Sequence, residues 1–571
     1  MDIFFKNKNI QDNVLLQAIN ITFIAIIFHY SPIDYECDGA NTLLNAKYIY
    51  HLIFTNDPIG ASYSYRAPVY KIIQIFSGAF TFDSFFPIIF VQIIFSILMP
   101  SIFYFTLLNI NRSFALLGSF LFLLSLIPIL HLKLILSVHT MIFFVVLSNY
   151  FVIKFVYQKK ISDFYLAFLT SVILLFTRFD GAFIFLGQAL ILSYYLFKTN
   201  LEFKTKLKHI LKSYSFVILT LCLWMTIKAL VILNLSVLSP IKFFESFTSL
   251  NHQTGAQLYW SLNNGIRQDV NRKYSYETDS DEYIDNLLLR SNGPASEKLY
   301  EHLKIFFEKK DTIEMISFYE NRMAPIFEKN KKMTNLEMYN NHYGNFYDDA
   351  SKIADNIFNK NFESLYYPLH IPGLLAHMYG KAKADKLLQG ASYEIIASNR
   401  DIQKIFFKKF VESYGSLGNL KFIIDGTYPN GMMTPWYNLT TFNSANCAQS
   451  SLSPKMFFEY EKQYNKNSNK SISIAIGEIA SSNKTILRSL IGSSILILLI
   501  FIFYTSKPFL VLILFVSYNV TLFFLSIMAS GVINSKSETY TLVLGLLIFI
   551  FLLSGLLNFL KRRFKIFKIN K

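Results

Sequence analysis

Long apolar runs, separated by polar segments, extend over most of the chain. The runs cover residues 13–30, 85–110, 113–130, 134–157, 163–177, 182–197, 213–237, 485–504, 508–529 and 540–560. Each run is close to the roughly 20 residues that a helix needs to cross a hydrocarbon core of about 30 Å. The pattern therefore predicts a mostly α fold, a polytopic membrane helical bundle of about ten spans.

Two of the polar segments are too long to be simple connectors. In the first, 31–84, apolar residues recur at helical spacing over 41–54 and 69–80, which predicts amphipathic helices on the membrane surface. The second, 238–484, carries helical periodicity over 296–330 and 380–412. The predicted domains are a transmembrane module at 1–237, a mainly helical insertion at 238–484 and a three-span module at 485–571.

Composition supports a membrane protein over a chain of several soluble domains. Hydrophobic residues make up 53% of the chain and charged residues only 16%. The net charge of +16 lies largely in lysines between the runs, so we expect no nucleic-acid partner. Three cysteines do not form a disulfide scaffold. Cys37 and Cys447 fall on the same side of the membrane and could pair, whereas Cys222 lies within a run and is expected to pack there.

Basic residues predict the orientation of the spans. With the N-terminus in the cytoplasm and strict alternation, the cytoplasmic segments hold Lys6, Lys8, Arg112, Lys159, Lys160, Lys198, Lys204, Lys206, Lys208, Lys212, Lys507, Lys561, Arg562, Arg563 and Lys565. The short outer loops hold only Lys47, Arg66, Lys71, Lys133, Arg178 and Lys536. The positive-inside rule then places both termini in the cytoplasm and the insertion outside, in what we expect to be a bacterial inner or plasma membrane.

Three carboxylates follow the first run within five residues. They are Asp34, Glu36 and Asp38, and a carboxylate beside a membrane is costly if buried. Glu36 is interpreted as a solvated surface charge. Asp38 precedes a predicted helix and could be its N-cap. Asp34 and Asp38 both remain candidates for a catalytic base.

Two further polar elements lie on the same predicted face. Arg66-Ala67-Pro68-Val69-Tyr70 precedes the second run, and Thr177-Arg178-Phe179-Asp180-Gly181 precedes the sixth. Together with the loop aspartate, and over residues 13–200, this order resembles the GT-C integral-membrane glycosyltransferases, which include protein mannosyltransferases and the lipid A aminoarabinose transferases. The chain departs from that pattern in carrying its large insertion before the last three spans. Its final outer loop, 535–540, also has no Arg-Tyr pair.

The resemblance implies transfer of a sugar, with inversion, from a polyprenyl-phosphate donor to a glycolipid, glycan or protein acceptor. Asp34 or Asp38 would act as general base on the acceptor hydroxyl. The other implied substrate-binding residues are Tyr65, Arg66, Tyr70, Lys133, Arg178 and Asp180. The cationic members would stabilise charge on the leaving phosphate, or would instead anchor the protein to lipid headgroups. Some relatives use a divalent metal ion near an acidic loop pair, so Mg²⁺ or Mn²⁺ stays open.

Lys228 lies well inside the seventh run and is a further substrate-binding candidate. An embedded lysine is expensive and often functional, although it can also snorkel to the interface. Two other functions stay open. An O-antigen-type polymerase or ligase would share the span count and the large outer loop, and would place its key Arg and His residues in that loop. A secondary transporter would show related halves, which this chain lacks.

Overall fold

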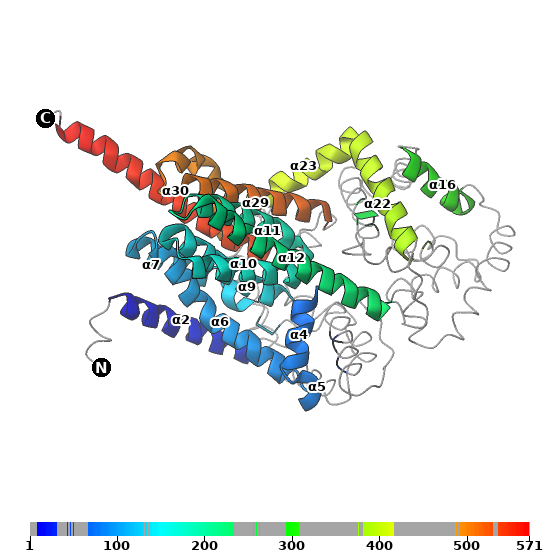
Figure 1. Ribbon diagram of the computed structural model, residues 1–571, viewed down its shortest axis with the longest axis horizontal. Helices are drawn as coiled ribbons and strands as arrows, with labels where there is room; N and C mark the ends of the chain where they lie inside the picture. The colour runs from blue at the N-terminus through cyan, green and yellow to red at the C-terminus, as the bar shows by residue number, and fades with distance from the viewer. Residues whose placement is uncertain are drawn as a thin grey trace.

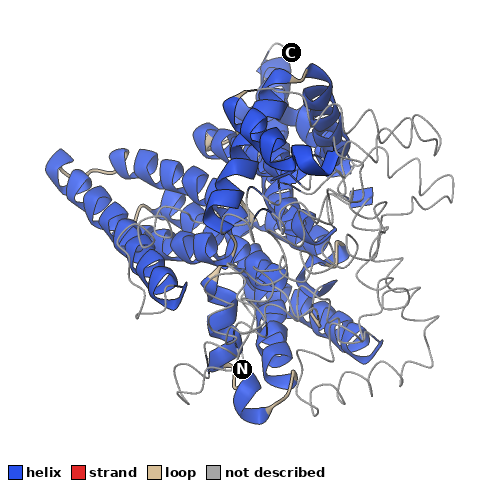
Figure 2. Cartoon of the chain, turned by 90° about the vertical axis from the view of Figure 1, so that its right-hand side faces the viewer, coloured by secondary structure: helices blue, strands red, loops and turns tan. Residues whose placement is uncertain are grey.

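The computed structural model of the chain describes residues 8–30, 67–130, 132–133, 137–232, 293–307, 381–415, 486–487, 490–528 and 535–569, with isolated residues 43, 46, 50, 255, 258, 259, 262 and 375. All regular structure in these ranges is helical, and no strand occurs there (Figures 1 and 2). The prediction of a mostly α fold is confirmed for this part of the chain.

Five helices are long and apolar enough to cross a membrane, as in a membrane protein. They are α2 (Lys8–Tyr30), α6 (Phe86–Leu108), α9 (Ser137–Gln158), α29 (Pro508–Met528) and α30 (Ser535–Ile569). Shorter apolar helices are α7 (Arg112–Leu124), α10 (Ile161–Thr177), α11 (Ala182–Phe197) and Leu490–Tyr504, which ends in the 3-10 helix η5 (Leu499–Tyr504). The helix α12 (Phe203–Ile232) covers most of the seventh run. The count of ten spans stays a prediction.

Several helix ends differ from the predicted ones. The run at 113–130 is not one helix, because α7 ends at Leu124 and the short helix α8 (Ile127–Leu130) follows. Between them Leu126 adopts a positive φ of 55°, which a helix cannot continue through. At the other extreme, α30 is 35 residues long and includes the basic tail that was expected to follow the last span.

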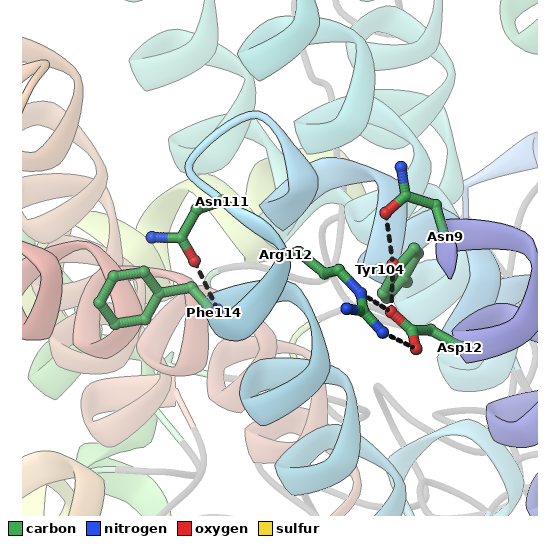
Figure 3. Close-up of polar contacts among 6 residues, drawn as sticks. All are labelled: Asn9, Asp12, Tyr104, Asn111, Arg112 and Phe114. Atoms are coloured by element: carbon green, nitrogen blue, oxygen red, sulfur yellow. Dashed lines mark hydrogen bonds and ion pairs between the residues drawn. The ribbon is translucent and has the colours of Figure 1, made fainter. Parts of the chain in front are cut away.

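Contacts between helix ends define two opposite ends of the bundle. At one, Lys133 lies over the ring of Phe28 and Tyr540 bonds to Asp180; we call it the site end. At the other, the basic end, Arg112 forms a two-pronged ion pair with Asp12, at 2.6 and 2.8 Å (Figure 3). Helix α2 therefore runs from the basic end, at Asp12, to the site end, at Phe28, and α6 returns to the basic end, where Tyr104 donates to Asp12. Which end faces the cytoplasm stays a prediction.

The core of the bundle lies around α9, which packs against α6, α10 and α30. The rings of Phe95 and Phe143 stack there, with centroids 4.1 Å apart. Apolar residues on the outside are exposed, as lipid-facing surfaces require, for example Leu190 on α11 and Leu219 on α12. Cys222 is among the exposed residues of α12, so the expectation that it packs in the core was wrong. The apolar run gave no sign of which face looks toward lipid.

The insertion contributes three described helices, α16 (Pro294–Phe307), α22 (Lys381–Ser398) and α23 (Arg400–Gly415). They confirm the helical periodicity over those parts of 296–330 and 380–412. Leu299 of α16 and Leu388 of α22 share a small separate core. Helix α23 contacts α29 and thereby joins the insertion to the bundle (Figure 1).

Candidate functional site

Helix α4 (Pro68–Phe76) lies at the site end. It is amphipathic, but its polar side chains are buried against the bundle. Pro68 sits in its first turn, where a missing N–H costs nothing, and Gly78, with φ of 90°, breaks it from α5 (Ala79–Phe82). Its buried residues include Tyr70, Lys71 and Gln74, whereas Phe76 is 76% exposed. The apolar face therefore looks outward and the polar face inward, which suits a helix that covers a polar site beside lipid.

The inward face of α4 meets a polar chain within the bundle. Nε2 of Gln92, on α6, donates to the hydroxyl of Tyr70 at 3.5 Å. The backbone carbonyl oxygen of the same residue, Gln92, lies 3.0 Å from Nε2 of His139, at the start of α9. These contacts connect α4, α6 and α9 through side chains that are almost fully buried.

The tautomer of His139 follows from its neighbours. Its Nε2 contacts the Gln92 carbonyl, which can only accept, and lies 3.1 Å from the hydroxyl of Ser96. The Ser96 hydroxyl donates its own hydrogen to the carbonyl of Pro128 at 2.7 Å. Nε2 must therefore carry the proton, which leaves Nδ1 as a bare acceptor. His139 thus bonds between helices, and its Nδ1 has no hydrogen-bond partner among the described residues.

Several buried polar atoms near this chain lack a hydrogen-bond partner among the described residues. They include both amide atoms of Gln74, Nδ1 of His139 and the hydroxyl of Thr140. A buried polar group left unsatisfied costs about 1–3 kcal/mol. The site end therefore holds buried donors and acceptors whose hydrogen-bonding capacity is not used within the described part of the chain.

Lys133 lies in the turn between α8 and α9. Its side chain is largely buried, with 7% of the residue exposed, and Nζ lies 4.4 Å from the centroid of the Phe28 ring. Burial lowers the pKa of Lys133 to about 8. Near neutral pH the amine is still mostly charged, so it can attract an anion, and the aromatic face helps to hold the cation.

The turn after α10 supplies the strongest polar contact of the site end. Nε of Arg178 donates to both carboxylate oxygens of Asp180, at 3.1 and 3.2 Å, and Nη2 donates to Oδ2 at 3.1 Å. The hydroxyl of the fully buried Tyr540, on α30, donates to the same Oδ2 at 2.5 Å. Asp180 is thereby held by Arg178, at the end of α10, and by Tyr540, on α30. Its carboxylate in turn holds the Arg178 guanidinium in place.

Local backbone structure makes that arrangement possible. Arg178 leaves the helix in an extended conformation, and the 3-10 turn η1 (Phe179–Gly181) brings Asp180 back beside it. A Cβ at Gly181 would lie 2.9 Å from the carbonyl oxygen of Leu174 and 3.1 Å from Met141, so this tight return favours glycine. The Arg178 side chain remains 28% exposed.

Four of the predicted site residues, Tyr70, Lys133, Arg178 and Asp180, therefore lie at one end of the bundle. The predicted residues Asp34, Asp38, Tyr65 and Arg66, and the cysteines Cys37 and Cys447, lie outside the described residues. Lys228 is within α12, and its side chain also lies outside the described part. Within that part no group of three or more His, Cys, Asp or Glu side chains could hold a metal ion.

Sequence reasoning missed Lys71, Gln74, Gln92 and Tyr540 as site residues. Gln92 had a usable signal, because it is an amide within a strongly apolar run. Gln74 lies four residues after Tyr70 and so shares its helix face, but the inward direction of Gln74 and Lys71 follows only from the reversed amphipathicity of α4. The sequence around Tyr540 did not mark it as a site residue, because its partner, Asp180, lies 360 residues away.

No protein family, no characterised protein and no solved structure matches the chain. The geometry of the site end is therefore the basis for assigning a function.

Proposed function

We propose that the chain is a membrane glycosyltransferase that transfers a sugar from a polyprenyl-phosphate donor to a glycolipid, glycan or protein acceptor. The observation that carries the proposal is the Arg178–Asp180–Tyr540 cluster, a fixed and partly exposed guanidinium at one end of an apolar bundle. Arginine matches phosphate oxygens in a forked geometry, and a lipid-linked phosphate would lie at this depth. The order of motifs that resembles GT-C enzymes supports the same assignment.

The reaction would be a single displacement with inversion. The acceptor hydroxyl oxygen forms a bond to the anomeric carbon while the bond from that carbon to the phosphate oxygen breaks. The electron pair of the broken bond stays on the phosphate, and the hydroxyl proton passes to the carboxylate of Asp34 or Asp38. Arg178 and Lys133 would stabilise the negative charge that grows on the leaving phosphate.

The buried polar chain beneath α4 would bind the sugar itself. The amide atoms of Gln74 and Nδ1 of His139, none of which has a partner within hydrogen-bond distance among the described residues, are a donor–acceptor set for neutral hydroxyl groups. A site built on hydrogen bonds discriminates strongly between sugars, because a missing hydroxyl leaves its partner buried and unpaired.

In the proposed topology the chain has about ten spans. Both termini lie in the cytoplasm, and the site end and the insertion lie on the outer face. The Lys and Arg residues at the basic end support this orientation, since that end holds Lys159, Lys160, Lys198, Lys507 and Arg562.

The test is a transfer assay with purified full-length protein and a panel of polyprenyl-phosphate sugars. We expect one donor to be consumed, and we expect loss of turnover in Asp34→Asn or in Asp38→Asn. Full activity in both variants would show that the base is elsewhere. Consumption of a polyprenyl-diphosphate oligosaccharide, with no polyprenyl-monophosphate sugar consumed, would favour the polymerase or ligase function and reject this proposal.

A further inference from the structure

Helix α23 of the insertion packs against a candidate membrane helix. Ile402 and Phe406 are buried on one face of α23, and Phe410, one turn further, meets Phe523 of α29 edge-on, with ring centroids 5.6 Å apart. This contact lies at the site end, because the next residue of α29, Phe524, contacts Phe183 just after the Arg178–Asp180 turn. The C-terminal half of α23 is thus at membrane level.

A second face of α23 is exposed, and its side chains change from basic to apolar along the helix. Arg400, Lys404, Phe407 and Val411 follow one another at intervals of four, three and four residues, so they form a single stripe. All four are exposed, Phe407 by 62%. The stripe is basic in the half away from α29 and apolar in the half beside it.

We propose that this stripe is a membrane anchor, with Phe407 and Val411 in the apolar part of the bilayer interface and Arg400 and Lys404 at the lipid phosphates. Seven residues separate Lys404 from Val411, a helical rise of about 10 Å. That rise agrees with the roughly 5–10 Å to which amphipathic helices bury their apolar faces. The order of charge and apolar surface is the one that a helix entering the interface obliquely requires.

Continuity with the lipid-facing surface of the bundle identifies the partner as a bilayer. Val520 of α29, one turn before Phe523, is exposed beside the docking contact, and α29 is long and apolar enough to cross a membrane. The ring of Phe407 lies 6.4 Å from that of Phe410, which meets Phe523, so Phe407 adjoins this exposed apolar surface. The anchor would fasten the insertion next to the Arg178–Asp180 turn, whatever reaction the site performs.

Depth measurements on the full-length protein in lipid nanodiscs test the anchor. In a background with Cys37, Cys222 and Cys447 replaced by Ser, a spin label is attached at Phe407→Cys, Tyr393→Cys or Val520→Cys. Tyr393, on α22, is 54% exposed and is the aqueous control; Val520 is the lipid control. We expect the ratio of oxygen to nickel-chelate accessibility at 407 to be close to that at 520 and several-fold above that at 393. A ratio at 407 equal to that at 393 would overturn the anchor.

The unmodified chain gives an independent test that does not depend on labelled variants. In bilayers that contain a phospholipid with a photoreactive acyl chain, we expect labelling of the segment 400–411 and none of 387–398. Labelling of neither segment, or equal labelling of both, would reject the anchor. For the phosphate contacts, Arg400→Gln with Lys404→Gln should make a label at 407 shallower, and an unchanged depth would reject them.

Discussion

The hydroxyl oxygen of Tyr540 lies 2.5 Å from Oδ2 of Asp180, although 360 residues separate them along the chain. This bond joins α30 to the turn after α10. Because Arg178 donates to the same carboxylate, the bond also restricts the position of Arg178. Hydrogen bonds to charged groups contribute about 1.5–3 kcal/mol to stability. The position of the partly exposed guanidinium is therefore set by a contact between segments that are 360 residues apart in the sequence.

Tyr540→Phe removes this bond and little else. We expect the free energy of unfolding to fall by about 1–3 kcal/mol, and the effect to be much smaller when Asp180 is already Asn. A double-mutant cycle, measured by thermal unfolding in nanodiscs, gives the coupling. Additive effects of the two substitutions would show that the bond contributes nothing.

Arg178→Lys keeps the positive charge and removes the forked geometry. We expect the affinity for the phosphate-linked donor to fall by roughly 10–100-fold, because a lysine cannot reproduce a bidentate contact. Arg112→Lys is the matched control, since Arg112 makes a similar forked pair with Asp12 at the opposite end. Binding of a radiolabelled donor compares the two variants; an equal loss in both would mean that the effect is on folding.

Lys133 should give a pH dependence, because its folded-state pKa is lowered to about 8 by burial. Donor affinity should fall as the pH rises through that value, since the amine loses its charge. Stability should move the opposite way: the unfolded chain holds the proton up to its ordinary pKa, so the folded state gains stability between that pKa and about 8 as the pH rises. Lys133→Met should abolish both trends, and binding curves at several pH values will show whether it does.

Gln74→Leu should separate stability from function. The wild-type amide is buried and has no partner within hydrogen-bond distance among the described residues. Its replacement by an apolar side chain should therefore raise the unfolding temperature, while sugar transfer should fall about tenfold or more. Gln188→Leu is the matched control, because Gln188 accepts from Ser171 at 2.7 Å and donates to Ser148 at 2.9 Å. That variant should lose stability. Unchanged transfer by Gln74→Leu would exclude the sugar contact.

Glu394 should hold the insertion together at neutral pH. Its carboxylate accepts from the backbone N–H groups of Ala295 and Ser296, at the N-terminus of α16. Partial burial alone would raise the pKa of Glu394, but these bonds lower it overall. Its stabilisation is thus present above the ordinary carboxyl pKa and is lost as the pH falls through the lowered one. Glu394→Gln should cost about 1 kcal/mol, seen as faster amide exchange in α16.

The sequence predicted the helical class and the positions of most helices, because apolar runs and charge placement act locally. The predicted helix ends were wrong where an apolar run extends beyond the end of the helix. The apolar run at 113–130 continues past Leu124, yet Leu126 turns to a positive φ and ends the helix. Cys222 looked like a packing residue because an apolar run does not distinguish lipid from protein as its surroundings.

The site was predicted in part for a similar reason. Arg178 and Asp180 are two residues apart, so their pairing could be expected from the motif, as could the position of Lys133 at the same end. The contributions of Tyr540 and Gln92 depend on contacts between distant helices, and no residue spacing encodes these. The inward direction of Gln74 depends on how α4 rests on the bundle.

The short helices beside the site have a consequence for the bilayer. Helices α10 and α11 have 17 and 16 residues, a length of about 25 Å, against a hydrocarbon core of about 30 Å. Their outer faces, including Leu169 and Leu190, are exposed where lipid would lie. Such a mismatch thins the surrounding bilayer. The membrane would be locally thinned beside Arg178, which would bring the phosphates of the adjacent leaflet closer to the guanidinium. Under the proposed function, this would shorten the path of a lipid-linked substrate into the site.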